Sequence, residues 1–406
     1  MSKISANIKN WWSTMFKAWV REYSLIFHDA GVLLFFFALP LAYPITYTLI
    51  YNPEVTENIP MAIVDNCRSS ESRELARMID ATQYIKVAGY PADMQEARRW
   101  MKERKVYSVL EIPSDYSHKL GRMEQAVLPL YCDMSLMIRY RNILFAITDV
   151  TLQLDGNVRT ETIDDSPIAF PASSMSGTPV DTQAFILGDP TQGFASFIMI
   201  GLVVLILQQS LILGVLMLGG ASSERRRKNF GVDPLEVSGP MSAAVLGRAM
   251  SYFTIYAPLV VYIFHYVPLM FSLPAIGNPL DYLLFIVPMI FASTFLGQMM
   301  RPLVVERESS FLVFVFSSVL FLFLSGITWP NSAMSPVWRL VAGLIPASWG
   351  VQGFVGINSN NATLADMAQP YLILWAMAIV YFFIAVNVEK MCQRHALRHY
   401  QVPSVP

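Results

Sequence analysis

Charged side chains are scarce in this sequence. Asp, Glu, Lys and Arg make up 15% of the 406 residues, whereas hydrophobic side chains make up 54%. Ordinary soluble domains carry about 25% charged residues, so this shortage excludes a typical soluble protein and indicates an integral membrane protein. The formal net charge of −1 gives no reason to expect a nucleic-acid partner.

Motifs for several kinds of chemistry are missing as well. The sequence contains no Gly-x-x-x-x-Gly-Lys-Ser/Thr motif and no Gly-Lys pair, so it lacks a phosphate-cradling loop for ATP. Its five His form no cluster with Cys or Asp at metal-ligand spacing. We also find no convergent carboxylates or His for a membrane enzyme acting on lipid-linked substrates. We therefore expect a chain that is not an enzyme and that itself binds neither a metal nor a cofactor.

Long apolar segments are what the sequence does contain. A hydrocarbon core of ~30 Å is crossed by about 20 apolar residues in a helix. The predicted fold is a mainly α-helical membrane protein with six transmembrane helices. These predicted spans are residues 31–50, 193–218, 246–270, 281–300, 311–327 and 371–388.

Residues 1–30, before the first span, are expected to form an amphipathic helix. Trp12, Phe16 and Ile26 recur at helical spacing, and Lys9 and Lys17 fall on the other side. A basic amphipathic helix with aromatic side chains favours the membrane interface; a soluble helix facing a core is the alternative. This N-terminus also lacks a short apolar core with a small-residue cleavage site, so we expect no removed signal peptide.

Polar residues are concentrated between residues 51 and 190. Short apolar runs such as 60–65 alternate with helical patterns such as 93–104, which is typical of a small, mostly parallel α/β sheet. Cys67 and Cys132 each follow a predicted strand, which is compatible with a place at the same sheet edge. An oxidising compartment would permit a disulfide between them, and two free buried thiols are the alternative.

Cations predict the orientation of the chain. The second span ends in Arg225, Arg226, Arg227 and Lys228, and adjacent cations at the end of a span are retained on the cytoplasmic side. The α/β domain at 51–190 then lies outside. The predicted cytoplasmic parts are both termini, at 1–30 and 389–406, and the loops 219–245 and 301–310.

The outer segment 328–370 is too apolar for a free loop. We expect short re-entrant helices that dip into the outer leaflet, because irregular backbone at that depth needs protein or a cavity around it. A loop packed on the surface under the α/β domain is the alternative.

Three polar side chains fall inside predicted spans, namely Gln208, Gln209 and His265. Such groups are candidates for function by default. For His265, a hydrogen bond to a neighbouring helix is the plainer explanation.

Several stretches resemble the permease subunits of ABC-2-type transporters, in the exporter-like class with a large outer domain after the first span. The similar stretches are residues 59–66, 69–73, 106–116, 325–330 and 344–349. Glu224-Arg225 and Pro240 match the loop that follows the second span in this family. The family's Gly-Thr pair is absent from that loop, and its spacing is longer here.

This resemblance implies a separate ATPase subunit that binds ATP and Mg²⁺ and docks on residues 222–240. The implied docking residues are Glu224, Arg225, Arg226, Arg227, Gly231, Pro234, Leu235 and Pro240. The alternative is that the basic run only sets the topology and meets anionic membrane lipid.

It also implies an exporter of the bacterial inner membrane. The aromatic and Met-rich composition of the spans suits a hydrophobic or amphiphilic cargo such as a drug or lipid. Two permeases, identical or homologous, would pair with the second and fifth spans at the seam, and a periplasmic adaptor is a further partner. A non-transporting membrane scaffold or receptor, whose outer domain binds a ligand or partner, is the alternative function.

Overall fold

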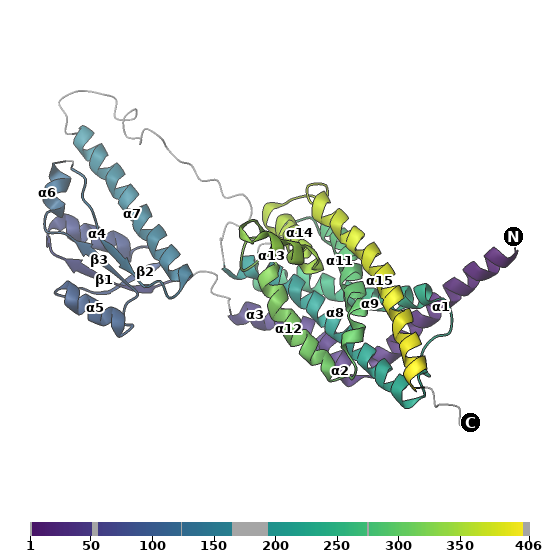
Figure 1. Ribbon diagram of the computed structural model, residues 1–406. Coiled ribbons are helices and arrows are strands. Elements are labelled where there is room, and N and C mark those ends of the chain that lie inside the picture. Colours follow the sequence, from purple (N-terminus) through teal and green to yellow (C-terminus); the bar gives the residue numbers. More distant parts are fainter. Residues whose placement is uncertain (1, 51–55, 123, 165–193, 274–275, 401–406) are drawn as a thin grey trace. The chain divides into compact units, whose positions relative to one another are not determined.

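The computed structural model describes residues 2–50, 56–122, 124–164, 194–273 and 276–400 (Figure 1). The last part of the predicted α/β domain 51–190, from residue 165 onward, lies outside these residues. The chain divides into two units, Met1–Glu54 with Ile186–Pro406 and Val55–Phe185, which are taken in turn.

The smaller unit contains a four-stranded sheet in the order β2-β1-β3-β4. The strands are β1 (Ile59–Asp65), β2 (Ile85–Gly89), β3 (Ser108–Ile112) and β4 (Leu130–Cys132). β1 runs parallel to β2 and β3, and β4 runs antiparallel to β3. The prediction of a small, mostly parallel α/β sheet is confirmed.

Helices cover both faces of this sheet (Figure 1). They are α4 (Ser70–Asp80), α5 (Met94–Lys102), α6 (Tyr116–Gly121) and α7 (Met137–Asp164). Leu75 of α4 and Ile143 of α7 share one core with Met61 and Ile63. Ala97 of α5 packs against Ala62 and Val64 on the other face, because successive side chains of a strand point to opposite sides.

The expectation that Cys67 and Cys132 share a sheet edge is wrong. Cys132 pairs with Ser108 at the start of β3, whereas Asp65, just before Cys67, pairs with Ile112 at its end. The two ends of β3 are about 13 Å apart, and a disulfide needs Cα atoms within ~7 Å. The prediction failed because β4 runs antiparallel to β3, so the end of β4 lies beside the start of β3. Both thiols are free.

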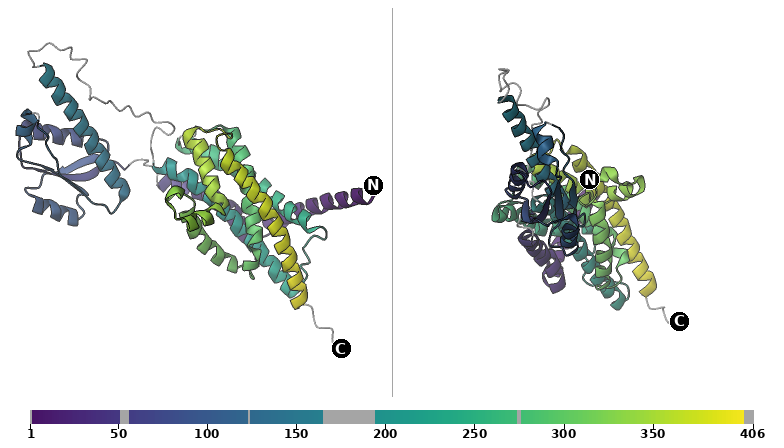
Figure 2. Two further views of the ribbon diagram at one scale, coloured as in Figure 1. Left: turned by 45° about the horizontal axis from the view of Figure 1, so that its top comes forward. Right: turned by 90° about the vertical axis from the view of Figure 1, so that its left-hand side faces the viewer.

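The larger unit begins with α1 (Ser2–Phe27), which packs along α9 (Met241–Val261). Figure 2 shows the N-terminal end of α1 leaving the bundle. Met15, Ala18 and Ile26 are buried, whereas Trp12 and Phe16 are exposed. One face of α1 therefore packs against α9, and the opposite face exposes aromatic side chains.

The first predicted span is formed by α2 (Ala30–Leu33), the π-helical turn η1 (Leu34–Ala38) and α3 (Leu39–Ile50). The later helices of the bundle are α8 (Phe194–Lys228), η3 (Tyr262–Tyr266), α10 (Val267–Phe271), α11 (Pro279–Met299), η4 (Arg301–Leu303), α12 (Ser309–Leu324), η5 (Asn331–Ala333), α13 (Pro336–Gly343), α14 (Pro346–Asn360) and α15 (Ala368–Tyr400).

Within the described residues, five helical segments are long and apolar enough to cross a membrane, and α13 with α14 makes a sixth if this bent pair counts as one span. The axes of α13 and α14 meet at 85°, so the segment 328–370 contains short helices as expected. The predicted fifth span is the 16-residue α12, which at about 24 Å is shorter than a ~30 Å hydrocarbon core.

Helix α8 is the central element of the bundle. Of its most apolar stretch, 94% is buried inside the protein, against α3, α11, α12 and α14. A helix enclosed by its own chain leaves no face for a second copy. The implied role of the second span at a permease seam therefore does not fit this structure, whereas α12 keeps an exposed apolar face with Leu312, Phe316 and Phe323.

Candidate functional site

The strongest concentration of charge in the larger unit lies at the C-terminal end of α8. Arg225, Arg226, Arg227 and Lys228 occupy its last turn, where cations interact favourably with the negative end of the helix dipole. The chain then turns back through residues 229–240, here called the return loop, before α9 begins.

The return loop starts with two residues in the left-handed region, Phe230 at φ +50° and Gly231 at φ +88°. The Gly231 N–H donates to the Arg226 carbonyl over 2.8 Å and ends the helix. A Cβ at Gly231 would lie 2.6 Å from the Ala396 carbonyl oxygen of α15. Gly231, a predicted docking residue, is thus required by the turn and by the close approach of α15.

Asp233 folds the return loop against α8. Its carboxylate accepts from Arg225 Nε over 2.9 Å and Nη2 over 3.0 Å, from Ser222 Oγ over 2.7 Å, and from the Leu235 N–H over 3.0 Å. Burial by itself raises the pKa of Asp233, but the hydrogen bonds from Arg225, Ser222 and Leu235 outweigh it and hold the pKa below its usual value. The carboxylate is therefore ionised, and its ion pair with Arg225 holds the return loop against α8.

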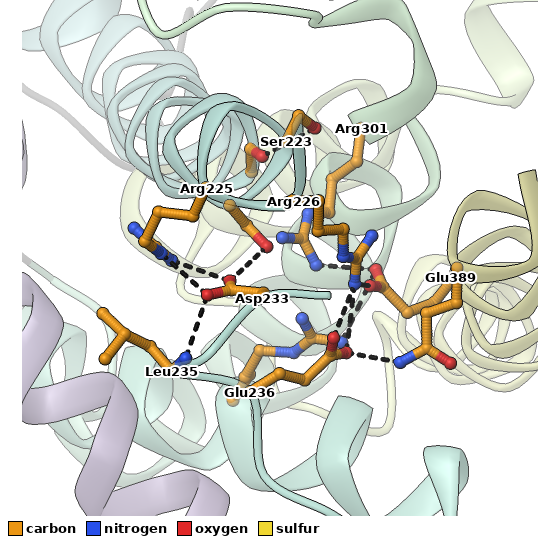
Figure 3. A network of polar contacts seen from close by, with 12 residues as sticks. Ser223, Arg225, Arg226, Asp233, Leu235, Glu236, Arg301 and Glu389 are labelled. Atoms are coloured by element: carbon orange, nitrogen blue, oxygen red, sulfur yellow. Dashed lines mark hydrogen bonds and ion pairs between the residues drawn. The ribbon is translucent and has the colours of Figure 1, made fainter. Parts of the chain in front are cut away.

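Glu389 of α15 is the centre of a second, buried set of ion pairs, shown in Figure 3. Its side chain is only 3% exposed and faces Arg226 at 2.7 Å, Arg301 at 2.6 Å and Arg248 at 3.6 Å. Glu236 of the return loop accepts from Arg226 over 3.0 Å and from Gln393 Nε2 over 2.6 Å. We call these six residues the charge junction.

The charge junction holds together segments that are far apart in the sequence. Its members come from α8, the return loop, α9, η4 and α15. A buried charge without a partner costs several kcal/mol, so each member depends on the others for its place. The junction thereby ties the return loop to the ends of three long helices.

The second loop of this end, residues 301–310, is also held on α8. The Arg307 N–H donates to Glu224 Oε1 over 2.7 Å, Arg227 pairs with Glu306 at 2.9 Å, and Arg307 pairs with Asp29. All four charged residues predicted for docking, Glu224, Arg225, Arg226 and Arg227, therefore make contacts within the chain. Of the three arginines, Arg227 has the most exposed side chain, at 42%. Their role in docking stays a prediction.

An apolar tip is the part of the return loop that faces outward. Phe230 is 65% exposed and Val232 is 55% exposed, and Pro234 beside them is exposed too. Leu235 and Pro240 are half-buried. Pro234 is one of the predicted docking residues, whereas Phe230 and Val232 were not predicted. The signal for them was two apolar residues inside a polar, turn-rich stretch.

An open groove adjoins the charge junction on the side of α15. It has a volume of about 420 Å³. Its walls are mainly apolar and include Val304, Val305, Val388 and Met391, with Arg226, Arg301 and His395 among its polar lining.

The predicted polar residues of the spans have separate surroundings. Gln208 is 1% exposed, and its Oε1 accepts from the Ala347 N–H over 2.7 Å and from Ser293 Oγ over 3.3 Å. Gln209 is 6% exposed, and its amide has no hydrogen-bond partner among the described residues. His265 is exposed with its ring edge on Tyr266; among the residues described, it makes no hydrogen bond to a neighbouring helix, contrary to our expectation.

The fold and this charged end define a class: a multi-pass helical membrane protein with an α/β insert and a folded polar return loop after its central helix. A family model described as ABC-2 family transporter protein matches residues 30–387. The chain belongs to this family and is the permease of an ABC-type transporter. A comparison with curated proteins gives no match.

Proposed function

We propose that this chain is the permease of an ATP-driven exporter, and that a separate ATPase subunit docks on its return loop. The ABC-2 family implies an ATPase partner in general. The observation that carries the docking site is the apolar tip of Phe230, Val232 and Pro234, exposed on a loop whose base is fixed by buried ion pairs. A rigid apolar tip is suited to bind in a pocket on a partner protein, because the return loop loses little conformational entropy on binding.

The same contacts make the return loop suited to transmit force. Asp233 ties it to α8, and Glu236 ties it through Arg226 to Glu389 of α15. A displacement of the tip by a closing ATPase would therefore move the ends of both helices together rather than deform the loop alone. In this proposal the charge junction is the rigid link, and the tip is its contact point.

Two copies of the permease, or this chain and a homologue, would form the complete transporter. The exposed apolar face of α12 supports pairing there, because a short helix gains cover from a second protomer as well as from lipid. The basic end lies on the cytoplasmic side of the inner membrane in this proposal, and the smaller unit lies outside, where a periplasmic adaptor could reach it.

Docking is tested by co-purification of the chain, in lipid nanodiscs, with candidate ABC ATPase subunits from the same genome. Phe230→Asp with Val232→Asp places two charges on the tip and should lower ATPase association at least tenfold, together with lipid-dependent ATP hydrolysis. Val127→Asp is the matched control, since Val127 is 63% exposed in the smaller unit. Unchanged association of the double variant overturns the docking site, and no association of the wild-type chain favours the scaffold or receptor function.

A further inference from the structure

A second cavity lies at the opposite end of α8 from the charge junction. It has a volume of about 570 Å³, which falls in the range of small-molecule sites. Its lining comes from the starts of α8 and α15, the chain after α12, and the length of α14. All of these segments belong to the larger unit.

The lining of this cavity is apolar on one wall and carries a single charged side chain, which is acidic. Its apolar wall includes Ile327, Val351, Val355 and Met367. Its polar side chains are hydroxyls and amides, with Asp366 as the one ionisable group and no Lys or Arg among the lining residues. The lining residues offer an anion no opposite charge, and the guanidinium of neighbouring Arg339 is engaged by the carbonyl oxygens of Asn331, Ser332 and Met334. A cation would find the carboxylate of Asp366.

Two acceptors of the lining differ in their surroundings: Asn331 Oδ1 is buried and lacks a donor among the described residues, whereas the Asp366 carboxylate is exposed. Asp366 uses Oδ2 for the Thr363 hydroxyl and N–H, over 2.7 Å and 2.9 Å, and these hydrogen bonds hold its pKa below the usual value. A buried acceptor without a donor costs free energy, so a ligand that supplies N–H groups would satisfy the site.

The backbone around the cavity is irregular. Gly326 has φ +89°, and a Cβ there would lie 3.2 Å from Asn331 Oδ1. The chain between α12 and α13 makes only a 3₁₀ turn, Asn331–Ala333. Near a membrane, such backbone is tolerated where it is buried in protein or lines a cavity, so this segment is suited to form a binding wall.

We propose that this cavity binds the transported cargo, and that the cargo is a cationic amphiphile: an apolar body lies against Val351 and Val355 while an ammonium head faces Asp366 and Asn331. This inference rests on the proposed transport function and narrows its cargo class. Anionic amphiphiles should bind weakly at this site, because no lining residue carries a positive charge to offset the cost of removing their hydration.

Continuous helices connect the cavity to the charge junction. Gly201 of α8 lines the cavity, and Arg226 of α8 lies in the junction, about 38 Å along one helix. On α15, Gln369 lines the cavity and Glu389 belongs to the charge junction, about 30 Å further along the same helix. A movement at the junction therefore reaches two walls of the cavity without passing through a flexible segment.

The test is equilibrium binding to the full chain in nanodiscs of zwitterionic lipid, without the ATPase. The probes share one fluorescent body and one alkyl tail and differ only in a terminal primary amine or a terminal carboxylate. Fluorescence anisotropy should give at least tenfold tighter binding of the amine probe. Asp366→Asn should weaken amine binding about fivefold, the change expected for an exposed ion pair of about 1 kcal/mol.

Gln352→Trp provides a second variant, because Gln352 is an exposed residue of α14 that lines the cavity. The indole fills part of the space without replacing a buried side chain, so the chain should fold and the amine probe should lose at least tenfold in affinity. Asp281→Asn is the control, since Asp281 is an acidic residue in the first turn of α11 that does not line the cavity.

Equal affinity for both probes, or full binding of the amine probe to the Gln352→Trp variant, overturns the proposal. Failure here is distinguishable from failure of the proposed function. Loss of binding at the cavity does not affect ATPase docking on the return loop. Amine binding without any ATPase association would support the binding site and contradict the proposed transport function.

Discussion

Glu389 is one buried carboxylate that faces three guanidinium groups. Glu389→Gln would leave Arg226, Arg301 and Arg248 without their shared anion, and loss of one partner of a buried ion pair costs about 3–5 kcal/mol. We expect a lower melting temperature in nanodiscs and faster hydrogen exchange in the return loop, because Arg226 also holds Glu236.

Glu308→Gln is the matched control, since Glu308 is an exposed carboxylate of the loop 301–310. It should change neither measurement. If both variants melt and exchange like the wild-type chain, the charge junction does not fix the return loop.

Cys132 gives a second prediction at the level of one residue. Burial raises the pKa of its thiol to about 11, from an ordinary value of 9.0. The thiolate is the reactive form, so at pH 8 two pKa units lower the reactive fraction about 100-fold. Alkylation of the folded full chain by iodoacetamide, followed by mass spectrometry, should be slow at Cys132 at pH 8 and should rise until about pH 11.

The denatured chain is the reference, and its Cys132 should react with an ordinary thiol profile. Both Cys67 and Cys132 should take up reagent without a reductant, because both are free. Equal rates in the folded and denatured chains would contradict the burial of this thiol, and a mass two protons lower with no labelling would indicate a disulfide.

At the scale of elements, Gln208 joins α8 to the start of α14. Its Oε1 accepts the Ala347 N–H, one of the donors that a helix N-terminus leaves without an internal partner. Gln208→Leu should destabilise the fold by about 1–3 kcal/mol, because it leaves that donor buried and unsatisfied. Thermal unfolding in nanodiscs measures the change.

The neighbouring Gln209 offers a matched comparison on the same helix. Its amide is buried without a partner among the described residues, so Gln209→Leu removes an unsatisfied group and should leave the melting temperature unchanged or raised. If the two variants shift the melting temperature alike, the contact between Gln208 and α14 contributes nothing specific.

These elements also separate what the sequence could predict from what it could not. The spans and the α/β insert follow from local periodicity, and they were predicted from runs such as 31–50 and 60–65. The pairing of Arg226 with Glu389 spans 163 residues, and no local pattern indicates it. For the same reason the basic run looked like a contact surface, although three of its four cations, Arg225, Arg226 and Arg227, form ion pairs within the chain.

The antiparallel return of β4 was missed for a related reason. A three-residue strand carries no periodicity that distinguishes its direction, and only its pairing with β3 sets it. Exposure of Phe230 and Val232 likewise depends on how α15 approaches Gly231, which is a tertiary contact.

At the scale of the whole molecule, the proposed function requires the return loop and the smaller unit to face opposite sides of the membrane. The four cations at the end of α8 oppose translocation of that end, because each would have to cross the hydrocarbon core. Single cysteines introduced into a chain without Cys67, Cys132 and Cys392 test this requirement. Ser238→Cys lies on the exposed return loop, and Tyr90→Cys lies at an exposed position of the smaller unit.

A membrane-impermeant maleimide should label Tyr90→Cys in spheroplasts and should label Ser238→Cys only after the membrane is permeabilised. Both sites are exposed, so a difference between them reports the side of the membrane and not burial. The reverse pattern would place the apolar tip outside, beyond the reach of an ATP-hydrolysing partner. That result would contradict ATPase docking on the return loop. The charge junction would then serve only to stabilise the contacts among the helix ends.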